Sequence, residues 1–315
     1  MYDIISMGEI LIDLTQTEVN PQGICLFAAH PGGAPANVAV AAARLGAKCA
    51  FWGKVGQDGL GDLLLQTLRA NNVSASGVRR GVQATSMAVV TLSPSGERSF
   101  RFLRGADQEL SVAELEESAL EHTKFFHFGS VSLTAGPSRT ATIFAARQAR
   151  THGVLISYDP NYRPSLWPDP ESALQWMAIP LPMVDLLKLS EEELPLLSHC
   201  SDLEEGSSKL ASLGPRLILV TLGERGVFYR WGTHTGTVPG VPVSVVDTNG
   251  AGDTFLGATL YALTRRPAGP LTDLTIPELE SILALANRAA AFTCSRSGAI
   301  PAMPLQQDLF PDHTP

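Results

Sequence analysis

The chain has 315 residues, 44% of them apolar and only 17% charged, a composition that excludes a disordered chain or a coiled coil and is typical of a folded protein. Its formal net charge is −8, from 23 basic and 31 acidic residues, which disfavours nucleic acid as a partner. No apolar run approaches the roughly 18 residues of a membrane span. The acidic start MYDIISMGEILIDL also lacks the basic region of a cleavable signal, so we expect a cytoplasmic protein with no membrane partner.

Short apolar runs alternate with amphipathic stretches, which predicts βαβ units and therefore a doubly wound, mainly parallel α/β sheet with helices on both faces. The predicted strands are residues 4–8, 50–55, 125–129, 154–158, 186–189 and 217–221. Predicted helices include residues 61–70, 138–152, 203–213, 253–264 and 277–292. In such a fold the carboxyl ends of the parallel strands form the crevice where a ligand binds.

One segment departs from this alternation. Residues 86–92 and 98–104 flank a Pro-Ser-Gly turn, which predicts a hairpin outside the main sheet. The polar, glycine-rich stretch near the start of the chain is expected to add strands beside this hairpin. We therefore predict a single α/β domain over residues 1–315, with a small β lid over the crevice formed from about 13–31 and 84–107.

The cysteines lie far apart and form no CxxC pair, so neither a zinc site nor a disulfide framework is predicted. They are Cys25, Cys49, Cys200 and Cys294. We interpret them as small buried hydrophobic residues.

The most informative segment is VVDTNGAGDTFLGA, at residues 245–258. Its β-branched residues predict a strand, which leads into the turn Gly250, Ala251 and Gly252 and then into a helix that begins near Asp253. The N–H groups of such a turn, with the positive end of a helix behind them, form a cradle for an anion. The small side chains let a phosphate approach the main chain closely.

Asp253 stands beside this cradle. A carboxylate there would repel phosphate unless a reacting hydroxyl lay between them, which is the arrangement that phosphoryl transfer to an alcohol requires. Asp253 is therefore our candidate base, kept ionised by the helix dipole, and the structural alternative is an N-cap aspartate. A P-loop protein and a nicotinamide enzyme are disfavoured, because the sequence has no GxxxxGK[ST] and the glycines near residue 250 lack GxGxxG spacing.

A second segment, GGAPANVAVAAARLG, covers residues 32–46. Pro35 suits the first turn of a helix, Gly46 suits its end, and the alanines allow close packing against the sheet. Asn37 is the polar exception on this helix. Its amide either binds a sugar hydroxyl above the two glycines or makes a local hydrogen bond to the glycine turn.

These two segments resemble the paired signatures of the ribokinase-like (phosphofructokinase B) family of carbohydrate kinases, and the resemblance extends through nearly the whole chain. Within that family the chain is most similar to the fructokinases. Six motifs fall in the expected order, and together they are far more specific than one. They are GGAPANVAVAAARLG, GERSF in the hairpin, YDPNYRPSLWP, VTLGERG, DTNGAGDTF and SGAIPAMP.

The resemblance implies that the γ-phosphoryl group of ATP is transferred to a primary hydroxyl of a sugar, with Asp253 as the base. The positions that match the family's anion hole are Gly250, Ala251 and Gly252. The positions that match its sugar site are Asp13, Gly32, Gly33, Asn37, Phe100, Arg104, Asn161 and Arg163. Of these, Phe100 and Arg104 belong to the lid, which closes over the sugar and excludes water as a competing acceptor.

The resemblance also implies a nucleotide site and two kinds of cation. The positions that match the nucleotide site are Ser190, Glu193, Thr221, Gly223, Gly226, Asn249 and Asn287. Glu193 is implied to organise Mg²⁺ and its waters near the phosphates, and Ser190 replaces the asparagine that is usual in ribokinases. A site for an activating K⁺ ion is implied at Asp247 and at the carbonyl oxygens of Asn249, Thr293, Arg296 and Gly298.

We therefore predict an ATP-dependent kinase that converts fructose to fructose 6-phosphate. Within the family, 2-keto-3-deoxygluconate kinases share DPNYRPSLWP and LSEEEL, and aminoimidazole riboside kinases share GGAPANVAV. Ala34 replaces the lysine common in ribokinases, which disfavours ribose. The alternative from another class is a binding or regulatory protein that keeps the fold without turnover. Because lids built from edge strands often pair between subunits, we also expect a homodimer through the lid.

Overall fold

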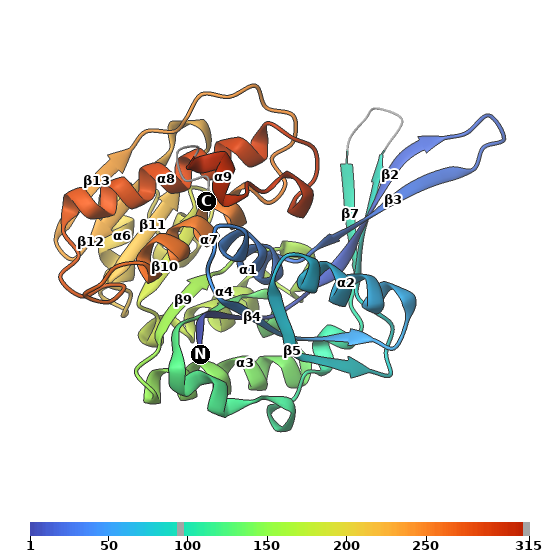
Figure 1. Cartoon of the computed structure of the whole chain (residues 1–315), viewed down its shortest axis with the longest axis horizontal. Coiled ribbons are helices and arrows are strands. Elements are labelled where there is room, and N and C mark those ends of the chain that lie inside the picture. Colours follow the sequence, from blue (N-terminus) through green and yellow to red (C-terminus); the bar gives the residue numbers. More distant parts are fainter. Residues whose placement is uncertain (93–97, 311–315) are drawn as a thin grey trace.

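Two sheets organise the chain, a large one in the body and a small one that projects from it (Figure 1). The computed structural model describes residues 1–92 and 98–310, without the side chains of residues 92 and 98–100. Within these residues the large sheet has nine strands in the order β13-β12-β11-β10-β9-β8-β1-β4-β5. Their bounds are β1 (Tyr2–Met7), β4 (Cys49–Gly56), β5 (Val73–Gly81), β8 (Thr123–Gly129), β9 (Leu155–Asp159), β10 (Leu186–Ser190), β11 (Leu217–Thr221), β12 (Val227–Trp231) and β13 (His234–Val238).

The large sheet is parallel from β11 to β5, and only β12 and β13 are antiparallel, at one edge. The strand order reverses at β1, which has β4 on one side and β8 on the other. Connections leave a crevice at such a switch point, beyond the carboxyl ends of the strands. The predicted doubly wound, mainly parallel sheet is confirmed.

Helices cover both faces of this sheet. One face packs against α1 (Ala34–Arg44), α2 (Gly59–Ala70), α7 (Ala251–Thr264), α8 (Ile276–Cys294) and α9 (Gln306–Leu309). The other face packs against α3 (Gly136–Thr151), α4 (Pro170–Ala178), α5 (Leu194–Ser198) and α6 (Leu203–Ala211). Successive strand residues alternate between the two cores: on β11, Leu217 and Leu219 enter the first core, and Ile218 and Val220 enter the second.

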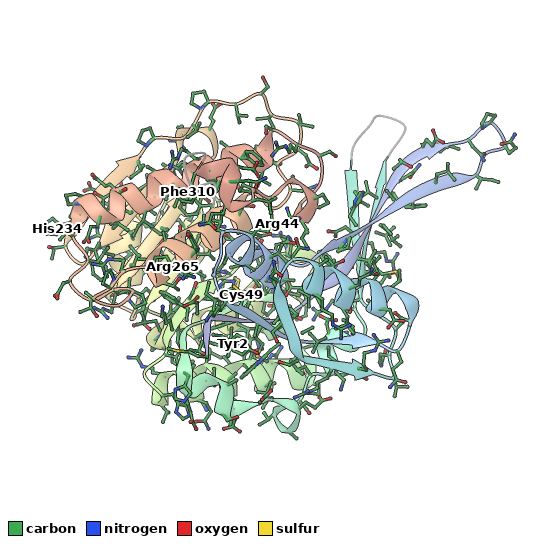
Figure 2. The ribbon with its side chains drawn as sticks, viewed as in Figure 1. Tyr2, Arg44, Cys49, His234, Arg265 and Phe310 are labelled. Atoms are coloured by element: carbon green, nitrogen blue, oxygen red, sulfur yellow. The ribbon has the colours of Figure 1, made fainter. Side chains whose placement is uncertain are left out.

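Helices α1 and α7 lie unusually close, and small side chains make this possible. A methyl group placed on Gly257 of α7 would stand 2.6 Å from the Cβ atom of Ala41 on α1 and 2.8 Å from the carbonyl oxygen of Val38. The end of α1 is held by Arg44, labelled in Figure 2, whose Nη1 donates to the Met303 carbonyl at 2.6 Å. The alanines of α1 were predicted to pack against the sheet, and Ala41 in addition faces Gly257 of α7.

The small sheet has the strand order β3-β2-β6-β7. Its strands are β2 (Leu11–Val19), β3 (Cys25–Gly32), β6 (Met87–Leu92) and β7 (Arg98–Leu103). Strands β2 and β6 are parallel, while β2 and β3, and β6 and β7, form antiparallel pairs. The predicted hairpin and the strands beside it are thus present, and Figure 1 shows them standing away from the body. That residues 1–315 form a single domain with this sheet as its lid stays a prediction.

Two local expectations were wrong. Val245 and Val246 are not in a strand: they are exposed, and the N–H groups of Val246 and Asp247 both donate to the Cys294 carbonyl at the end of α8 instead of to a neighbouring strand. Of the four cysteines only Cys49, on β4 of the large sheet, is buried, whereas Cys25 on the small sheet is exposed and Cys200 and Cys294 are half-buried. Helix α7, expected to begin near Asp253, begins at Ala251.

In the described part of the chain, no helix combines the length and the apolar character that crossing a membrane requires.

We predict that Gly257→Ala destabilises the fold. The added methyl group gains the helix propensity that alanine has over glycine, about 1 kcal/mol, but it overlaps Ala41, and overpacking costs about 1–3 kcal/mol. We expect a net loss of up to about 2 kcal/mol in the free energy of unfolding, measured with urea. The matched control is Gly59→Ala at the start of α2, where a methyl group meets nothing within 4 Å and should cost nothing. Equal stability of both variants would contradict close α1–α7 packing.

Candidate active site

The turn of residues 250–252 forms the wall between two cavities. Gly250 has a left-handed backbone with φ 75° and caps α7, and a methyl group there would lie 2.9 Å from the Ala299 side chain. Only glycine fits this position. Asp253 lies in the first turn of α7, so the N-cap alternative for Asp253 is wrong: Gly250 is the cap. The first N–H groups of a helix have no partner within the helix, which makes this end a candidate anion cradle, although the Ala251 N–H donates to the Thr248 carbonyl at 3.2 Å.

The first cavity, which we call the lid cavity, has a volume of about 350 Å³ and lies between the small sheet and the body. Seven residues predicted for catalysis or sugar binding line it, six of them outside the turn of residues 250–252. The six are Asp13, Gly33, Asn37, Asn161, Arg163 and Asp253. Gly250 lines it too. Residues from β2, α1, the β9 loop and α7 therefore meet at one place although more than 200 positions separate Asn37 from Asp253.

The second cavity, which we call the α8 cavity, has a volume of about 400 Å³ and a largely apolar wall. Four residues predicted for the nucleotide site line it, namely Thr221, Gly223, Gly226 and Asn287. Ala251 and Gly252 belong to its wall as well. The turn thus presents Gly250 to the lid cavity and its next two residues to the α8 cavity.

Asp253 is the buried acid of the lid cavity. Its Oδ2 accepts a hydrogen bond of 2.8 Å from Nδ2 of Asn37. Burial raises the pKa of Asp253 to about 6, against the lowering effects of Asn37 and of the cations Lys188 and Arg163. We had expected the helix dipole to hold this acid at an ordinary pKa, but desolvation is the larger effect. Asp253 is consequently ionised at neutral pH and a stronger base than the sequence indicated.

Asp13 and the glycine pair lie opposite Asp253. Burial raises the pKa of Asp13 to about 6, and Arg163 opposes this shift. A methyl group on Gly32 would come within 2.3 Å of the Asp13 carboxylate, and one on Gly33 within 2.5 Å of the Glu9 carbonyl. Gly33 also has φ 108° and caps α1. Both glycines are needed for the chain to pass Asp13 and enter α1, although Gly32 itself does not line the cavity.

Asn161 and Arg163 follow the end of β9. Asn161 has a left-handed φ of 48°, and its N–H donates to Asp159 Oδ1 at 3.1 Å, which fixes the sharp turn after the strand. Arg163 is exposed, and its Nη1 donates to the carbonyl of its neighbour Tyr162. Arg163 is nevertheless among the residues that line the lid cavity.

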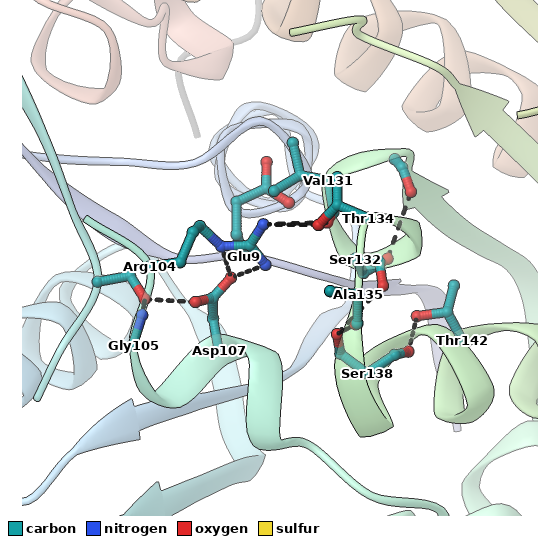
Figure 3. Close-up of polar contacts among 12 residues, drawn as sticks. Glu9, Arg104, Gly105, Asp107, Val131, Ser132, Thr134, Ala135, Ser138 and Thr142 are labelled. Atoms are coloured by element: carbon teal, nitrogen blue, oxygen red, sulfur yellow. Dashed lines mark hydrogen bonds and ion pairs between the residues drawn. The ribbon is translucent and has the colours of Figure 1, made fainter. Parts of the chain in front are cut away.

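The two expected lid residues differ. Arg104 does not line the lid cavity: Figure 3 shows its guanidinium turned to Asp107, the Val131 carbonyl and the Thr134 hydroxyl, where it is almost fully buried. It connects the end of β7 to the body. Phe100 is in β7, but its side chain lies outside the described part of the structure. Phe102, two residues further on, lines the lid cavity.

On the nucleotide side, Asn287 does not offer its amide N–H₂ to the cavity. Its Nδ2 donates to the carbonyls of Val238 and Pro239, at 3.2 and 2.9 Å, and so holds the segment after β13 against α8. Gly226, with φ 96°, is required because a side chain would strike the Val238 carbonyl at 2.1 Å. The contacts of Asn287 and Gly226 hold the segment after β13 in place, and residues 240–243 of that segment line the α8 cavity.

Ser190 and Glu193 line neither cavity. Both carboxylate oxygens of Glu193 accept main-chain hydrogen bonds, from Tyr162 at 2.6 Å and from Ser190 at 2.8 Å. The Ser190 hydroxyl accepts one from the Glu193 N–H at 3.2 Å. Glu193 therefore ties the loop after β9 to the end of β10.

The residues expected to bind K⁺ gather where the loop before α7 meets the end of α8. Asp247 accepts hydrogen bonds from the N–H groups of Asn249 at 3.1 Å and Gly298 at 3.0 Å. Thr293 is buried, and its hydroxyl donates to Thr254 on α7 at 3.0 Å. The Arg296 guanidinium is directed elsewhere, to the ring of Phe292, while its N–H donates to the Thr293 carbonyl.

Two buried charged residues near the site were not predicted from the sequence. Lys188 on β10 and Asp159 at the end of β9 form an ion pair of 2.9 Å beneath the turn of residues 250–252. A lysine within the apolar run LLKLS is an available sequence signal, because lysine is seldom buried without a partner.

Residues 1–306 match the pfkB family of carbohydrate kinases. The chain is 40% identical to "Probable fructokinase-5" of Arabidopsis thaliana, over 97% of this chain and 95% of the other. The fructokinase of Xylella fastidiosa with bound ATP superimposes with a TM-score of 0.92 at 33% identity, over 99% of this chain and 98% of that one. A double mutant of the Vibrio cholerae O395 fructokinase, with fructose, ADP and potassium ion bound, gives 0.88 at 33% identity, over 98% and 97%.

The expected family is confirmed by a match that spans both sheets and the residues around both cavities. The chain belongs to the pfkB family of carbohydrate kinases.

Proposed function

We propose that the protein is an ATP-dependent fructokinase, which transfers the γ-phosphoryl group of ATP to the primary hydroxyl of D-fructose to give fructose 6-phosphate. The observation that carries this proposal is that the turn of residues 250–252 separates the lid cavity from the α8 cavity, with the buried acid Asp253 on the lid side. The names of the compared fructokinases support the choice of sugar.

In this proposal the sugar occupies the lid cavity and the nucleotide the α8 cavity. Asp13 accepts hydrogen bonds from vicinal hydroxyls, and Asn37 holds the Asp253 carboxylate toward the reacting hydroxyl. Asp253 takes the proton of that hydroxyl as the oxygen attacks phosphorus. The N–H groups at the start of α7 stabilise the transferred group, and Arg163 supplies a fork of donors to its oxygens.

The proposal includes Mg²⁺ and K⁺ as cofactors. Within residues 1–92 and 98–310 no group of three or more His, Cys, Asp or Glu side chains could hold a metal, so Mg²⁺ would be held mainly by phosphate oxygens and water, as is usual for this ion. It would neutralise phosphate charge. Asp247 and the carbonyl oxygens of Asn249, Thr293, Arg296 and Gly298 are hard oxygen donors of the kind that suits K⁺. The cytoplasmic location stays a prediction from the sequence.

A sugar panel tests the proposed function. ADP release is measured at saturating ATP with fructose, ribose, 2-keto-3-deoxygluconate, aminoimidazole riboside and no acceptor. We expect fructose to give the highest kcat/KM, chelation of Mg²⁺ to abolish turnover, and replacement of K⁺ by Na⁺ to reduce it. Preference for the keto acid would instead indicate that Arg163 pairs with a substrate carboxylate. If no acceptor increased ADP release, the protein would be a binding module.

Asp253→Asn tests the base. The amide keeps the hydrogen bond to Asn37 but cannot accept a proton, so we expect kcat to fall by a factor of about 100 to 10,000. ATP affinity, measured by calorimetry, should change little, because the turn of residues 250–252 is untouched. Turnover close to that of the wild type would refute the assigned role.

The same variant should be more stable than the wild type. The folded-state pKa of Asp253 is raised from 3.8 to about 6, so the folded protein binds the proton more tightly and loses stability as pH rises between these values. Removing the charge should therefore raise the free energy of unfolding by up to about 3 kcal/mol above pH 6. Below pH 3.8 the gain should vanish. A gain of the same size at both pH values would contradict the burial argument.

The expected homodimer is also part of the proposal. Ile24 and Phe27, on the turn and the edge strand of the lid, are 58% and 42% exposed, and an edge strand with apolar side chains is prone to pair with a second copy. We expect sedimentation velocity to show a dimer that Phe27→Asp converts to a monomer. Val82→Asp, at an exposed position outside both sheets, is the control and should not change the mass. A monomeric wild type would rule out this assembly.

A further inference from the structure

Lys188 is a charged residue in the middle of a buried strand. Strand β10 reads LLKLS, lies between β9 and β11, and buries Lys188 to 6% exposure, between Leu187 and Leu189. An ammonium group that leaves water without compensation is strongly destabilising, so its position needs an explanation.

The compensation comes from Asp159. Nζ of Lys188 lies 2.9 Å from Oδ2 of Asp159, which is equally buried at the end of the neighbouring strand β9. The other oxygen of Asp159 accepts the N–H of Asn161. The pair is therefore fixed at the carboxyl edge of the sheet, where the two strands end beneath the active site.

The ammonium group also lies against the anion cradle. A methyl group placed on Gly252 would stand 3.1 Å from Nζ of Lys188. Lys188 lines neither cavity, so its charge reaches the site from behind the turn of residues 250–252. The single hydrogen bond that the structure gives to Nζ goes to Asp159, while an ammonium carries three N–H donors.

Stability alone does not account for this pair. Replacing a buried ion pair by apolar side chains of similar volume is often neutral or stabilising, because desolvation offsets the Coulomb attraction. Burying a lysine and an aspartate beneath the cradle therefore carries a cost that well-packed apolar residues would avoid. Because Nζ lies close to Gly252, the compensating benefit is positive charge next to the turn of residues 250–252.

We propose that Lys188 is a positioning residue for phosphoryl transfer, which adds positive potential behind the turn of residues 250–252 and keeps the Asp253 carboxylate ionised. The inference rests on the proposed kinase function. Negative charge that develops on the transferred group would meet both the N–H groups of the turn and the ammonium behind them, in a site with little water.

The charges that face Asp253 come from several elements. Asp159 on β9 raises its pKa, while Lys188 on β10 and Arg163 on the following loop lower it. Asp13 on β2 also interacts with Asp253, and Asn37 on α1 is neutral. Arg163 is exposed, so Lys188 is the buried cation of the set.

The charges that face Lys188 itself are Asp159, Glu193 and Asp253. His127 on β8 also faces it, and burial lowers the pKa of His127 to about 3, so this imidazole is neutral at the pH of the reaction. Because the Lys188 charge lowers the pKa of Asp253, loss of that charge should raise it.

The test is the pH dependence of fructose phosphorylation by Lys188→Met, whose side chain is of similar length but uncharged. The wild type should lose kcat/KM as pH falls through about 6, as Asp253 becomes protonated. In Lys188→Met we expect this acid limb to move upward by about one pH unit and kcat to fall at least about tenfold, with little change in the KM for fructose. Lys188→Arg, which keeps the charge, should keep the acid limb near its original position.

Lys54→Met is the matched control. Lys54 is a largely buried lysine on β4 in an ion pair of 2.7 Å with Glu114, and it lines neither cavity. Its replacement should lower thermal stability without moving the acid limb.

Each result decides the inference. A folded Lys188→Met with the wild-type kcat, or with a reduced kcat but an unmoved acid limb, would overturn it. If Lys188→Met fails to fold because Asp159 is left unpaired, the double variant Asp159→Asn, Lys188→Met decides: a folded protein with kcat reduced at least about tenfold supports the inference, and wild-type kcat or failure to fold overturns it. A wild type without turnover would refute the proposed function instead.

Discussion

The hydrogen bond between Asn37 and Asp253 is the contact on which the site depends, because it joins the first turn of α1 to the first turn of α7. It can form only if the two helices approach closely, and they do so because Gly257 faces Ala41 and the Val38 carbonyl. The helix starts are in turn fixed by Gly33 and Gly250, both with positive φ. Small residues along α1 and α7 thus hold the hydrogen-bonded side chains of Asn37 and Asp253 beside the turn of residues 250–252.

Burial of acids is the electrostatic consequence of this arrangement. Asp13 and Asp253 both have a pKa raised to about 6, and Glu9, behind the start of α1, has one raised to about 7. One oxygen of Glu9 accepts the Ala34 N–H, and the other has no hydrogen-bond partner within the structure. These three acids around one cavity lower folding stability when they ionise. In return, a carboxylate with a raised pKa is a better base for the hydroxyl that the proposed reaction deprotonates.

Much of this could be predicted from the sequence, where local patterns determine structure. The apolar runs located six of the parallel strands, and the glycine and alanine patterns located the starts of α1 and α7 to within two residues. What failed depended on distant contacts. Val245 and Val246 have strand propensity, but the carbonyl at the end of α8 takes their segment's N–H groups. Arg104 follows a lid strand, yet Asp107 and the Val131 carbonyl turn it toward the body (Figure 3). The Cys294 and Val131 carbonyls lie far along the chain and cannot be inferred from neighbouring residues, although Asp107 lies only three residues after Arg104.

The wall between the two cavities consists mainly of main chain, because larger side chains do not fit there. A side chain on Gly250 would collide with Ala299, and one on Gly252 would press on Lys188, so neither position tolerates the bulk that would separate donor from acceptor. The lid cavity is polar at its floor, with Asp13, Asn37 and Asp253, whereas the α8 cavity is largely apolar, as the flat face of a base requires. In the proposed function, the sugar and the nucleotide would therefore be kept in separate cavities that meet at the turn of residues 250–252, where the phosphoryl group would be transferred.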